Sequence, residues 1–432
     1  MIVGLAIRLF LAPLPGHTGD LSINQSWMDS AVLLGVADSF DHQVEMKYPP
    51  NHGPVEIYLY YASGRLYQKF ISPQYDIVQP ANRIFLKFPA ILADLWICVL
   101  LFIIFRKTRS NAAGLLAAAV YALQPAAIYT SAFWGQTDSI WVAFVLSAFV
   151  ALDRNWYSTA SACVLIACLH KPQAMIFLPL FAFVFPWRLH DILRALNAVA
   201  ATLAILLLPF YFHGNLPSGI RVISTAFIVR GELSVNAYNF WWILFGPAAR
   251  AIQPRELLLP FISYHTVGTA LFLGIYGSIL LALRKRLRGQ SHDRIEVILV
   301  AGSIIASAFF LFSTSIHERY LFPFLLFGMP FLFRGRKGAL LYIIISLVFL
   351  FNLILLHTLS KMSPIFSAHS SIMSVIAAWC MSLLFFPHYF LALRFRNSPL
   401  HHQADAVNGN PNPIDEAKHA PITVNVGGTA AA

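Results

Sequence analysis

The chain has 432 residues, of which 58% are hydrophobic and only 11% are charged, with a net charge of +11 and a mean hydropathy of +0.66. Soluble proteins carry about a quarter charged residues, so this composition excludes an ordinary soluble protein and predicts a polytopic membrane protein. The basic balance is typical of cytoplasmic loops between membrane spans, and we expect no nucleic-acid partner.

Apolar runs long enough to cross a bilayer as helices recur along the chain. Helices are the expected spanning form, because backbone groups in lipid must be satisfied within the segment and the alternation of barrel strands is absent. Lys and Arg collect in cytoplasmic loops. This rule places the following segments inside: RKTR (106–109), DRNW (153–156), PWRLHDILR (186–194), RKRLRGQSHDR (284–294), RGRK (334–337) and RFR (394–396).

The runs between these segments predict about twelve transmembrane helices with both termini inside. They cover residues 1–13, 86–105, 110–130, 138–152, 157–170, 173–186, 194–211, 262–283, 295–314, 317–333, 339–357 and 371–393. Two long segments, 14–85 and 212–261, then become extracytoplasmic loops. The expected fold is an all-α polytopic membrane domain over 1–394, followed by a polar, disordered cytoplasmic tail over 395–432.

The first run, MIVGLAIRLFLAP (1–13), is short for a span and does not resemble a cleavable signal peptide. Either the protein begins upstream, or this helix is tilted and partly interfacial. Arg8 in this run and Asp94 in the next lie a little below the outer surface in the expected topology. Buried charges in membranes usually pair, so we predict an ion pair between them.

The first outer loop opens with GDLSINQSW (19–27), at the start of an amphipathic helix predicted over 21–35, as in an interfacial helix. Asp20 has two candidate roles, the N-cap of this helix or a general base at the outer surface. The rival carboxylates in the same loop are Asp29, Asp41 and Glu45. Tyr48 belongs to KYPPNHGP (47–54), a Pro-rich turn that predicts an ordered loop.

Another outer helix start is predicted at FWGQTDS (133–139). Trp134 fits an aromatic belt at the membrane surface, and Thr137 or Asp138 fits an N-cap.

The stretch 157–186 is interpreted as two short helices, because Pro172 disfavours a continuous helix and basic segments flank both ends. HKPQ (170–173) then forms the outer turn. Lys171 either snorkels to the interface or contributes a cation to an anion site.

The second outer loop contains Arg221 and Arg230, which are either solvated loop charges or ligands for a phosphate. Its segment VNAYNFWWILFG (235–246), with Asn239 and Trp241, is aromatic enough to stack on a sugar ring. An aromatic belt at the interface explains the same composition.

The segment FSTSIHERYLFPF (312–324) places three ionisable residues between two apolar runs, at the predicted outer start of a helix. Ser315 and Glu318 have the spacing of a capping box. That role leaves His317 and Arg319 unexplained. A helix N-terminus with an Arg and a His favours an anion, which at this membrane surface indicates a lipid phosphate.

The cysteines Cys98, Cys163, Cys168 and Cys380 all lie in apolar runs. Their spacing indicates neither a disulfide framework nor a metal site, so we expect no metal and no cofactor.

The order of these motifs is more specific than any one of them. GD…W, YPP, WGQ.DS, KPQ, NAYN.WW and HERY follow one another over about residues 1–335. This order resembles the GT-C superfamily of integral-membrane glycosyltransferases. The closest likeness is to the dolichyl-phosphate-glucose-dependent glucosyltransferases of asparagine-linked glycan assembly and their bacterial relatives. The final spans and the tail carry no matching motif.

The resemblance implies a GT-C-like multi-pass hexosyltransferase of a cell membrane, here the bacterial inner membrane. Such enzymes move a sugar from a polyprenyl-phosphate donor to a glycan or lipid-linked acceptor outside the cytoplasm. The family's acidic base matches Asp20, and its HE motif matches His317 and Glu318. Many bacterial relatives carry Arg next, which matches Arg319. The expected donor-phosphate ligands are His317, Arg319, Lys171, Arg221 and Arg230, and the expected substrate-binding or structural residues are Glu318, Asp138, Tyr48, Asn239 and Trp241.

Two other classes of protein remain open. A transporter or flippase of a lipid-linked sugar would show internal repeats and several buried charges, and no convincing repeat is seen. A non-catalytic membrane subunit would bind a lipid-linked sugar without turnover. Substituting Asp20 by Asn separates both from an enzyme.

Overall fold

The computed structural model describes residues 1–40, 50, 52–73, 79–225, 231–289 and 292–395. A compact unit runs from Met1 to Arg394, and the predicted tail lies outside the described residues apart from its first residue. The longer helices are α1 (Ile2–Leu11), α2 (Thr18–Leu34), α3 (Pro54–Phe70), α4 (Pro80–Thr108), α5 (Asn111–Ala122), α7 (Asp138–Asp153), α8 (Tyr157–His170), α10 (Leu189–Phe212), α11 (Leu216–Thr225), α13 (Tyr264–Ala282), α15 (Arg294–Phe312), α18 (Gly335–Ile354) and α20 (Pro364–Leu393).

Short helical segments connect these helices. They are η1 (Asp38–Phe40), α6 (Pro125–Ile128), η2 (Tyr129–Trp134), η3 (Pro172–Phe177), α9 (Leu178–Val184), α12 (Phe240–Phe245), η4 (Gly246–Arg250), α14 (Arg284–Arg288), η5 (Glu318–Leu321), α16 (Phe324–Phe327), α17 (Met329–Leu332), η6 (Leu355–Leu359) and α19 (Ser360–Met362). The strand β1 (Ser234–Val235) pairs in parallel with β4 (Ile316–His317), and β2 (Leu257–Leu259) pairs with β3 (Ile262–Ser263) in antiparallel.

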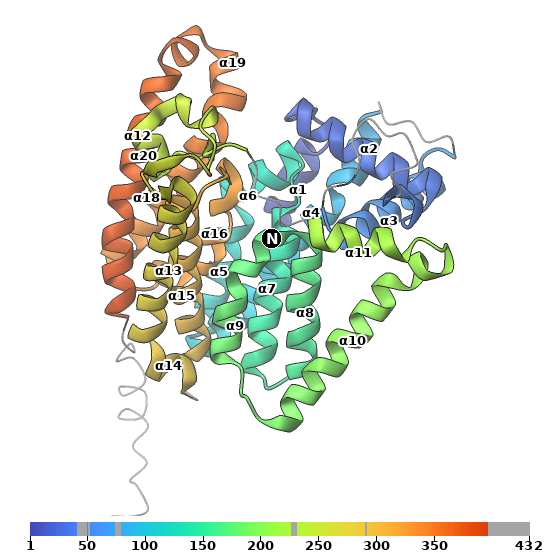
Figure 1. Cartoon of the computed structure of the whole chain (residues 1–432), viewed down its shortest axis with the longest axis horizontal. Helices are drawn as coiled ribbons and strands as arrows, with labels where there is room; N and C mark the ends of the chain where they lie inside the picture. Colours follow the sequence, from blue (N-terminus) through green and yellow to red (C-terminus); the bar gives the residue numbers. More distant parts are fainter. Residues whose placement is uncertain (41–49, 51, 74–78, 226–230, 290–291, 396–432) are drawn as a thin grey trace, which may run out of the picture. The chain divides into compact units, whose positions relative to one another are not determined.

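The described chain is dominated by helices that lie side by side (Figure 1). Six of them, α4, α10, α13, α15, α18 and α20, are long and apolar enough to cross a membrane, and α5 with α6 and η2 forms one more candidate bent by 46°. In α15, 89% of the most apolar stretch is buried, against 6% in α10. The helix α15 is therefore central and α10 peripheral. These features identify an all-α membrane protein.

The predicted count of twelve spans is not confirmed. Several predicted spans correspond to short elements: α1 for 1–13, α7 for 138–152, α8 for 157–170, η3 and α9 for 173–186, and η5, α16 and α17 for 317–333. The last of these is interrupted because Pro323 and Pro330 lack backbone donors, and each stands at the start of a new helical turn. The predicted break at 170–173 is confirmed, since α8 ends at His170.

The predicted ion pair between Arg8 and Asp94 is confirmed, and both side chains are buried. Arg8 Nε lies 2.8 Å from Asp94 Oδ2. Arg8 Nη1 also donates to the carbonyl oxygen of Ala122, at 2.6 Å. Tyr121 and Ser131 donate to the Asp94 carboxylate at 2.9 and 2.6 Å. This network ties α1 to α4, α5 and η2.

The amphipathic helix predicted at 21–35 is α2, which begins earlier, at Thr18. Its side chains Trp27 and Met28 pack on Ile57 and Tyr60 of α3 in one buried cluster. The apolar face of α2 therefore covers α3, whereas an interfacial helix would present that face to lipid. The helix α3 was not predicted from the sequence.

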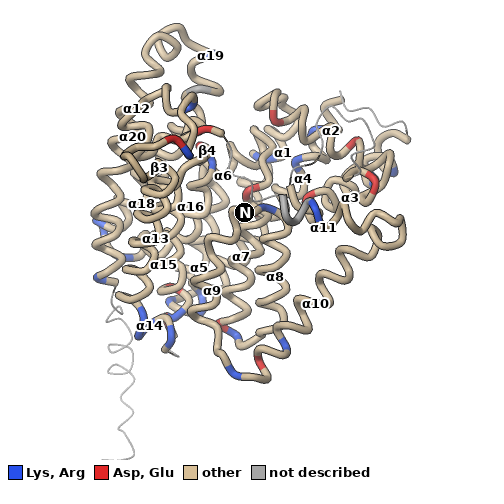
Figure 2. The backbone as a smooth tube through the Cα atoms, in the orientation of Figure 1, with Lys and Arg blue, Asp and Glu red and all other residues tan. Residues whose placement is uncertain are grey.

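Charged side chains divide the membrane domain into two ends (Figure 2). Lys and Arg gather at the end that contains α14 and the connection from α9 to α10. The ion pairs at this basic end include Lys107 with Asp153, at 2.6 Å, and Arg109 with Glu296, whose Nε–Oε1 distance is 2.8 Å. By the positive-inside rule we expect this end to face the cytoplasm.

We expect labelling in intact cells to follow this assignment. The test uses His213→Cys after α10 and Lys285→Cys in α14, both exposed positions, in a chain whose native cysteines have been replaced. An impermeant maleimide should modify position 213 in intact cells and position 285 only after lysis. The opposite pattern would invert the orientation.

Candidate functional site

A polar pocket of about 230 Å³ lies among α2, the segments before α3 and after η2, the strands β1 and β4, and the short helices η5 and η6. It is lined by His17, Asp20, Ile23, Asn24, Trp27, His52, Gln136, Val235, Asn236, His317, Glu318, Arg319 and His357. Four residues predicted for the site, Asp20, His317, Glu318 and Arg319, are therefore brought together. They come from segments about 300 residues apart in the sequence, which only the tertiary structure joins.

The link from α1 to α2 places Asp20 in the pocket. Gly16 has a φ of 53°, and a Cβ there would lie 2.0 Å from the carbonyl oxygen of Phe133, so only glycine fits. Lys87 of α4 donates from Nζ to the carbonyl oxygens of Leu14 and Phe133, at 2.8 Å each. These contacts hold the start of α2 against the end of η2.

Asp20 does not cap the helix, contrary to one of its two predicted roles. The helix begins one turn earlier than expected, and its N-cap is His17, whose Nδ1 accepts from the backbone N–H of Asp20 at 3.3 Å. The Asp20 carboxylate is therefore free of capping and turns toward Trp134 and Gln136. Trp134 Nε1 and Gln136 Nε2 donate to Oδ2, at 2.9 and 2.8 Å.

The carboxylate of Asp20 is the part-exposed acid of the pocket, with 31% of its side chain accessible. Burial alone would raise its pKa, but the charges of Arg319 and His17 and the hydrogen bond from Trp134 lower the pKa below its ordinary value. Asp20 is therefore ionised at neutral pH. Its Oδ1 accepts no hydrogen bond from the described part of the chain.

The HERY segment enters the pocket through a short parallel ribbon. Val235 pairs with His317 across β1 and β4, and Asn236 bridges to His317 as well. This pairing keeps Ile316 and His317 extended, so helical structure begins only at Glu318, with His317 as N-cap and no side-chain cap. The predicted capping box between Ser315 and Glu318 is therefore wrong.

Arg319 is 7% exposed and lies among carboxylates. Its Nε is 3.5 Å from Asp138 Oδ2, and its Nη1 is 3.9 Å from Asp20 Oδ2. These are ion-pair distances without hydrogen-bond geometry. In the described part of the chain Arg319 makes no hydrogen bond, and its Nε is buried without an acceptor. A guanidinium has five N–H donors, so its capacity is largely unused.

Lys171 and Asp138 stand behind Arg319. The Lys171 side chain is 2% exposed and donates to Asp138 Oδ2 at 3.4 Å. Lys171 does not line the pocket, so any effect on a bound anion passes through Asp138 and Arg319. The N-cap of α7 is Thr137, as predicted, but its hydroxyl donates to Glu56 at 2.7 Å instead of capping the helix.

Three histidines of the pocket, His17, His52 and His357, were not predicted from the sequence. The ring centroids of His17 and His357 are 4.3 Å apart, and His357 Nε2 lies 3.3 Å from Glu318 Oε1. Burial lowers the pKa of His17 below its ordinary value, and the neighbouring charge of Asp20 opposes that shift. No local signal marks His357, because it sits in an apolar run at the end of α18.

A buried carboxylate, Glu56, backs the pocket from α3. It is hydrogen-bonded to His52 and accepts from Tyr60 and Thr137 at 3.1 and 2.7 Å. Burial alone would raise the pKa of Glu56, but the charge and hydrogen bond of His52 hold it well below the usual range. The spacing of His52 and Glu56 at a helix start was the available signal, and it was missed.

Other predicted residues lie away from the pocket lining. Asn239 caps α12 and donates to the carbonyl oxygen of Phe310 at 3.1 Å. Trp241 is fully buried and donates to the carbonyl oxygen of Phe312 at 2.9 Å, so its ring faces the core. Arg221 is an exposed residue of α11. Tyr48 and Arg230, with the rival acids Asp41 and Glu45, lie outside the described residues.

Trp134 was expected in an aromatic belt, but it is 1% exposed. Gly135, which follows it, has a φ of 89°, in the left-handed region that favours glycine. That turn presents Trp134 and Gln136 to Asp20 together.

Within the described ranges, no group of three or more His, Cys, Asp or Glu side chains could hold a metal ion. The pocket therefore presents one accessible carboxylate, a guanidinium with unused donors, and several imidazoles. No family model matches the sequence, and neither does any curated protein.

Proposed function

We propose that the protein transfers a hexose from a polyprenyl-phosphate-linked donor to a glycan, lipid-linked or polysaccharide acceptor on the extracytoplasmic face of the membrane. The observation that carries the proposal is the state of Arg319 beside Asp20. A buried guanidinium without hydrogen bonds in the described chain suits a group that supplies several acceptor oxygens at once. A phosphate does so and can be bound by two parallel N–H···O bonds.

Asp20 is suited to take the proton of the acceptor hydroxyl. Trp134 and Gln136 hold Oδ2, which leaves Oδ1 for the hydroxyl. The hydroxyl oxygen forms a bond to the anomeric carbon while the bond from that carbon to the phosphate oxygen breaks. The electron pair leaves with the phosphate, and the proton goes to Asp20. Arg319 and His317 stabilise the charge that grows on the leaving phosphate.

Donor binding would also tune the base. The charge of Arg319 depresses the pKa of Asp20 in the free protein. A phosphate bound to Arg319 offsets that charge, so the pKa of Asp20 rises when the donor arrives. A carboxylate of higher pKa is a stronger base. The same contact would then position the donor and prepare the acid–base step.

The location of the pocket agrees with a lipid-linked donor. Two elements that line it, α2 and β4, lie at the end of the membrane domain opposite the basic loops (Figure 2). Its volume of about 230 Å³ is below the ~300–1,000 Å³ of sites that enclose a drug-sized ligand. The pocket therefore suits the polar head of a lipid better than a complete soluble substrate.

The rival proposal is a transporter or flippase of a lipid-linked sugar. Several buried charges of the kind expected for it are present, among them Arg8, Lys87 and Asp94. Arg8 and Asp94 pair with each other, and Tyr121 and Ser131 donate further hydrogen bonds to the Asp94 carboxylate. The accessible carboxylate of Asp20 beside the cationic cradle favours the enzyme. A non-catalytic subunit would bind the donor through the same cradle.

We expect Arg319→Ala to weaken donor use by about 10- to 150-fold, because a hydrogen bond to a charged group contributes about 1.5–3 kcal/mol. Arg319→Lys should restore part of the loss, since it keeps the charge without the two parallel donors. The measurement is transfer of radiolabelled hexose from a panel of polyprenyl-phosphate hexoses to membrane glycans, with thermal stability in detergent recorded alongside.

The matched control is Arg250→Ala, which removes an exposed cation that does not line the pocket. It should leave transfer unchanged. Equal transfer by the Arg319→Ala and Arg250→Ala variants would remove Arg319 from the phosphate site. Binding of polyprenyl phosphate without any transfer from the panel would instead favour the subunit.

A further inference from the structure

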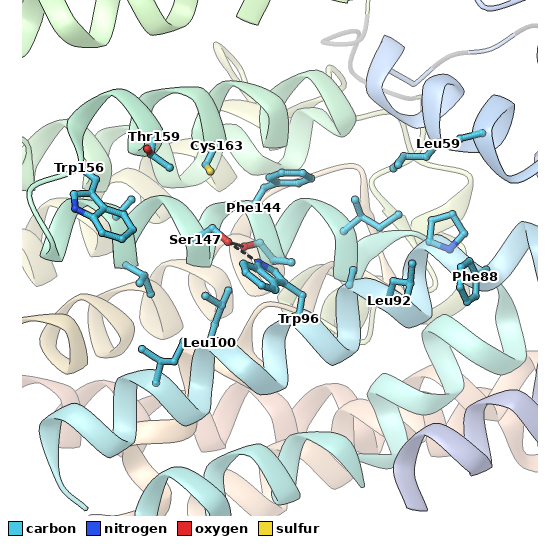
Figure 3. A pocket seen from close by; sticks show the side chains of 18 of the residues that line it. Leu59, Phe88, Leu92, Trp96, Leu100, Phe144, Ser147, Trp156, Thr159 and Cys163 are labelled. Carbon is cyan, nitrogen blue, oxygen red and sulfur yellow. Dashed lines mark hydrogen bonds between the residues drawn. The ribbon is translucent and has the colours of Figure 1, made fainter. Parts of the chain in front are cut away.

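A second cavity, larger and apolar, lies between α4, α7 and α8, with one end against α3 (Figure 3). Its volume is about 620 Å³. Leu92, Leu100 and Phe144 are among the labelled side chains that point into it. It shares no residue with the polar pocket around Asp20.

The cavity is a groove that follows α7 for most of its length. Lining residues recur along that helix at Ile140, Phe144, Ser147, Ala151 and then at Arg154, just past its end. At 1.5 Å per residue this spacing corresponds to about 21 Å. Half of a bilayer's hydrocarbon core is about 15 Å thick. The groove can therefore receive a lipid chain across more than one leaflet.

In the middle of the groove, the polar atoms of Trp96 and Ser147 form a hydrogen bond with each other. Trp96 Nε1 donates to Ser147 Oγ at 2.9 Å, as Figure 3 shows. This bond leaves apolar surface from Leu59 at one end to Trp156 at the other. A polar ligand would find few partners along this length, whereas an acyl chain needs none.

The basic end of the groove carries a cation beside an indole. Arg154 is exposed, and its guanidinium lies 5.2 Å from the centre of the Trp156 ring. In the described part of the chain Arg154 has no carboxylate partner, because the neighbouring Asp153 is paired with Lys107 at 2.6 Å. Trp at this depth is typical of the membrane–water interface. The cation therefore lies at the height of lipid headgroups.

We propose that this groove is a binding site for a glycerophospholipid with an anionic headgroup, taken from the cytoplasmic leaflet. One acyl chain lies along α4 and α7, and the headgroup phosphate binds Arg154. The occupant is not the sugar donor, because Arg154 adjoins Asp153 of the basic end, whereas Arg319 lines the polar pocket, with which the groove shares no residue. The inference does not depend on glycosyl transfer.

The first test counts retained lipid. The protein is purified in mild detergent, titrated with phosphatidylglycerol and examined by native mass spectrometry. Arg154→Gln should weaken retention of the first phosphatidylglycerol by about 10- to 150-fold, the value of one hydrogen bond between charged groups. The control is Arg106→Gln, an exposed arginine at the same end that also faces an aromatic ring, Phe102. It should retain the lipid as the wild type does.

The second test locates the chain. Phosphatidylglycerol with a diazirine in its acyl chain should crosslink to residues 92–100 of α4 and 144–151 of α7. Labelling spread equally over α10 and α20, or an equal loss of retention in both arginine variants, would show ordinary annular lipid and overturn the proposal. Stronger labelling of the groove by a diazirine polyprenyl phosphate would overturn it in favour of the donor chain.

Discussion

Asp20→Asn is expected to lower hexose transfer by about 10²- to 10⁴-fold, the usual contribution of a general base. An amide cannot accept the proton of the acceptor hydroxyl. This substitution should test the role of the carboxylate without removing a helix cap, because His17 caps α2 and Asp20 does not. An Asn side-chain oxygen can still accept from Trp134 and Gln136, so the thermal stability of the variant should stay near that of the wild type.

The transfer assay with polyprenyl-phosphate hexoses measures this effect, and binding of polyprenyl phosphate is measured in parallel. Asp29→Asn is the control, because Asp29 lies in the same helix but does not line the pocket. A base at position 20 predicts retained binding with lost transfer in Asp20→Asn alone. Near-normal transfer by Asp20→Asn would show that the base is another carboxylate of the first outer loop. Loss of transfer in Asp29→Asn alone would lead to the same conclusion.

Asp94→Ala is expected to lower the free energy of unfolding by about 3–5 kcal/mol, as removing one partner of a buried ion pair does. The substitution leaves Arg8 buried without its carboxylate. It also removes the acceptor of the hydrogen bonds from Tyr121 and Ser131. Denaturation in detergent, followed by circular dichroism, measures the loss.

Asp153→Ala provides the control, because Asp153 pairs with Lys107 at the surface, where such pairs contribute about 0–1 kcal/mol. Replacing both charged partners, as in Arg8→Met with Asp94→Leu, should recover much of the loss, since no uncompensated charge remains. A wild-type unfolding curve for Asp94→Ala would show that the pair contributes little to stability.

The amino-acid sequence determined the features that depend on composition and on local chemistry. Hydropathy alone identified an all-α membrane protein, because the free energy of transferring a segment into lipid depends on that segment's own side chains. Pro172 marked the break between two short helices, since proline cannot donate within a helix. Arg8 and Asp94 were predicted to pair because neither charge is tolerated alone in the membrane.

Only the tertiary structure decided how long the spans are and which polar side chains meet. The run at 317–333 was predicted as one helix, yet pairing of β1 with β4 keeps His317 extended and delays helical structure to Glu318. That pairing depends on a segment about 80 residues away. Trp134 and Gln136 donate hydrogen bonds to Asp20, and Arg319 supplies the nearby positive charge. No local pattern in the sequence relates these residues to Asp20. Apolar helices can pack in many arrangements of similar burial, so a polar residue's partners are set by the packing and not by its neighbours in sequence.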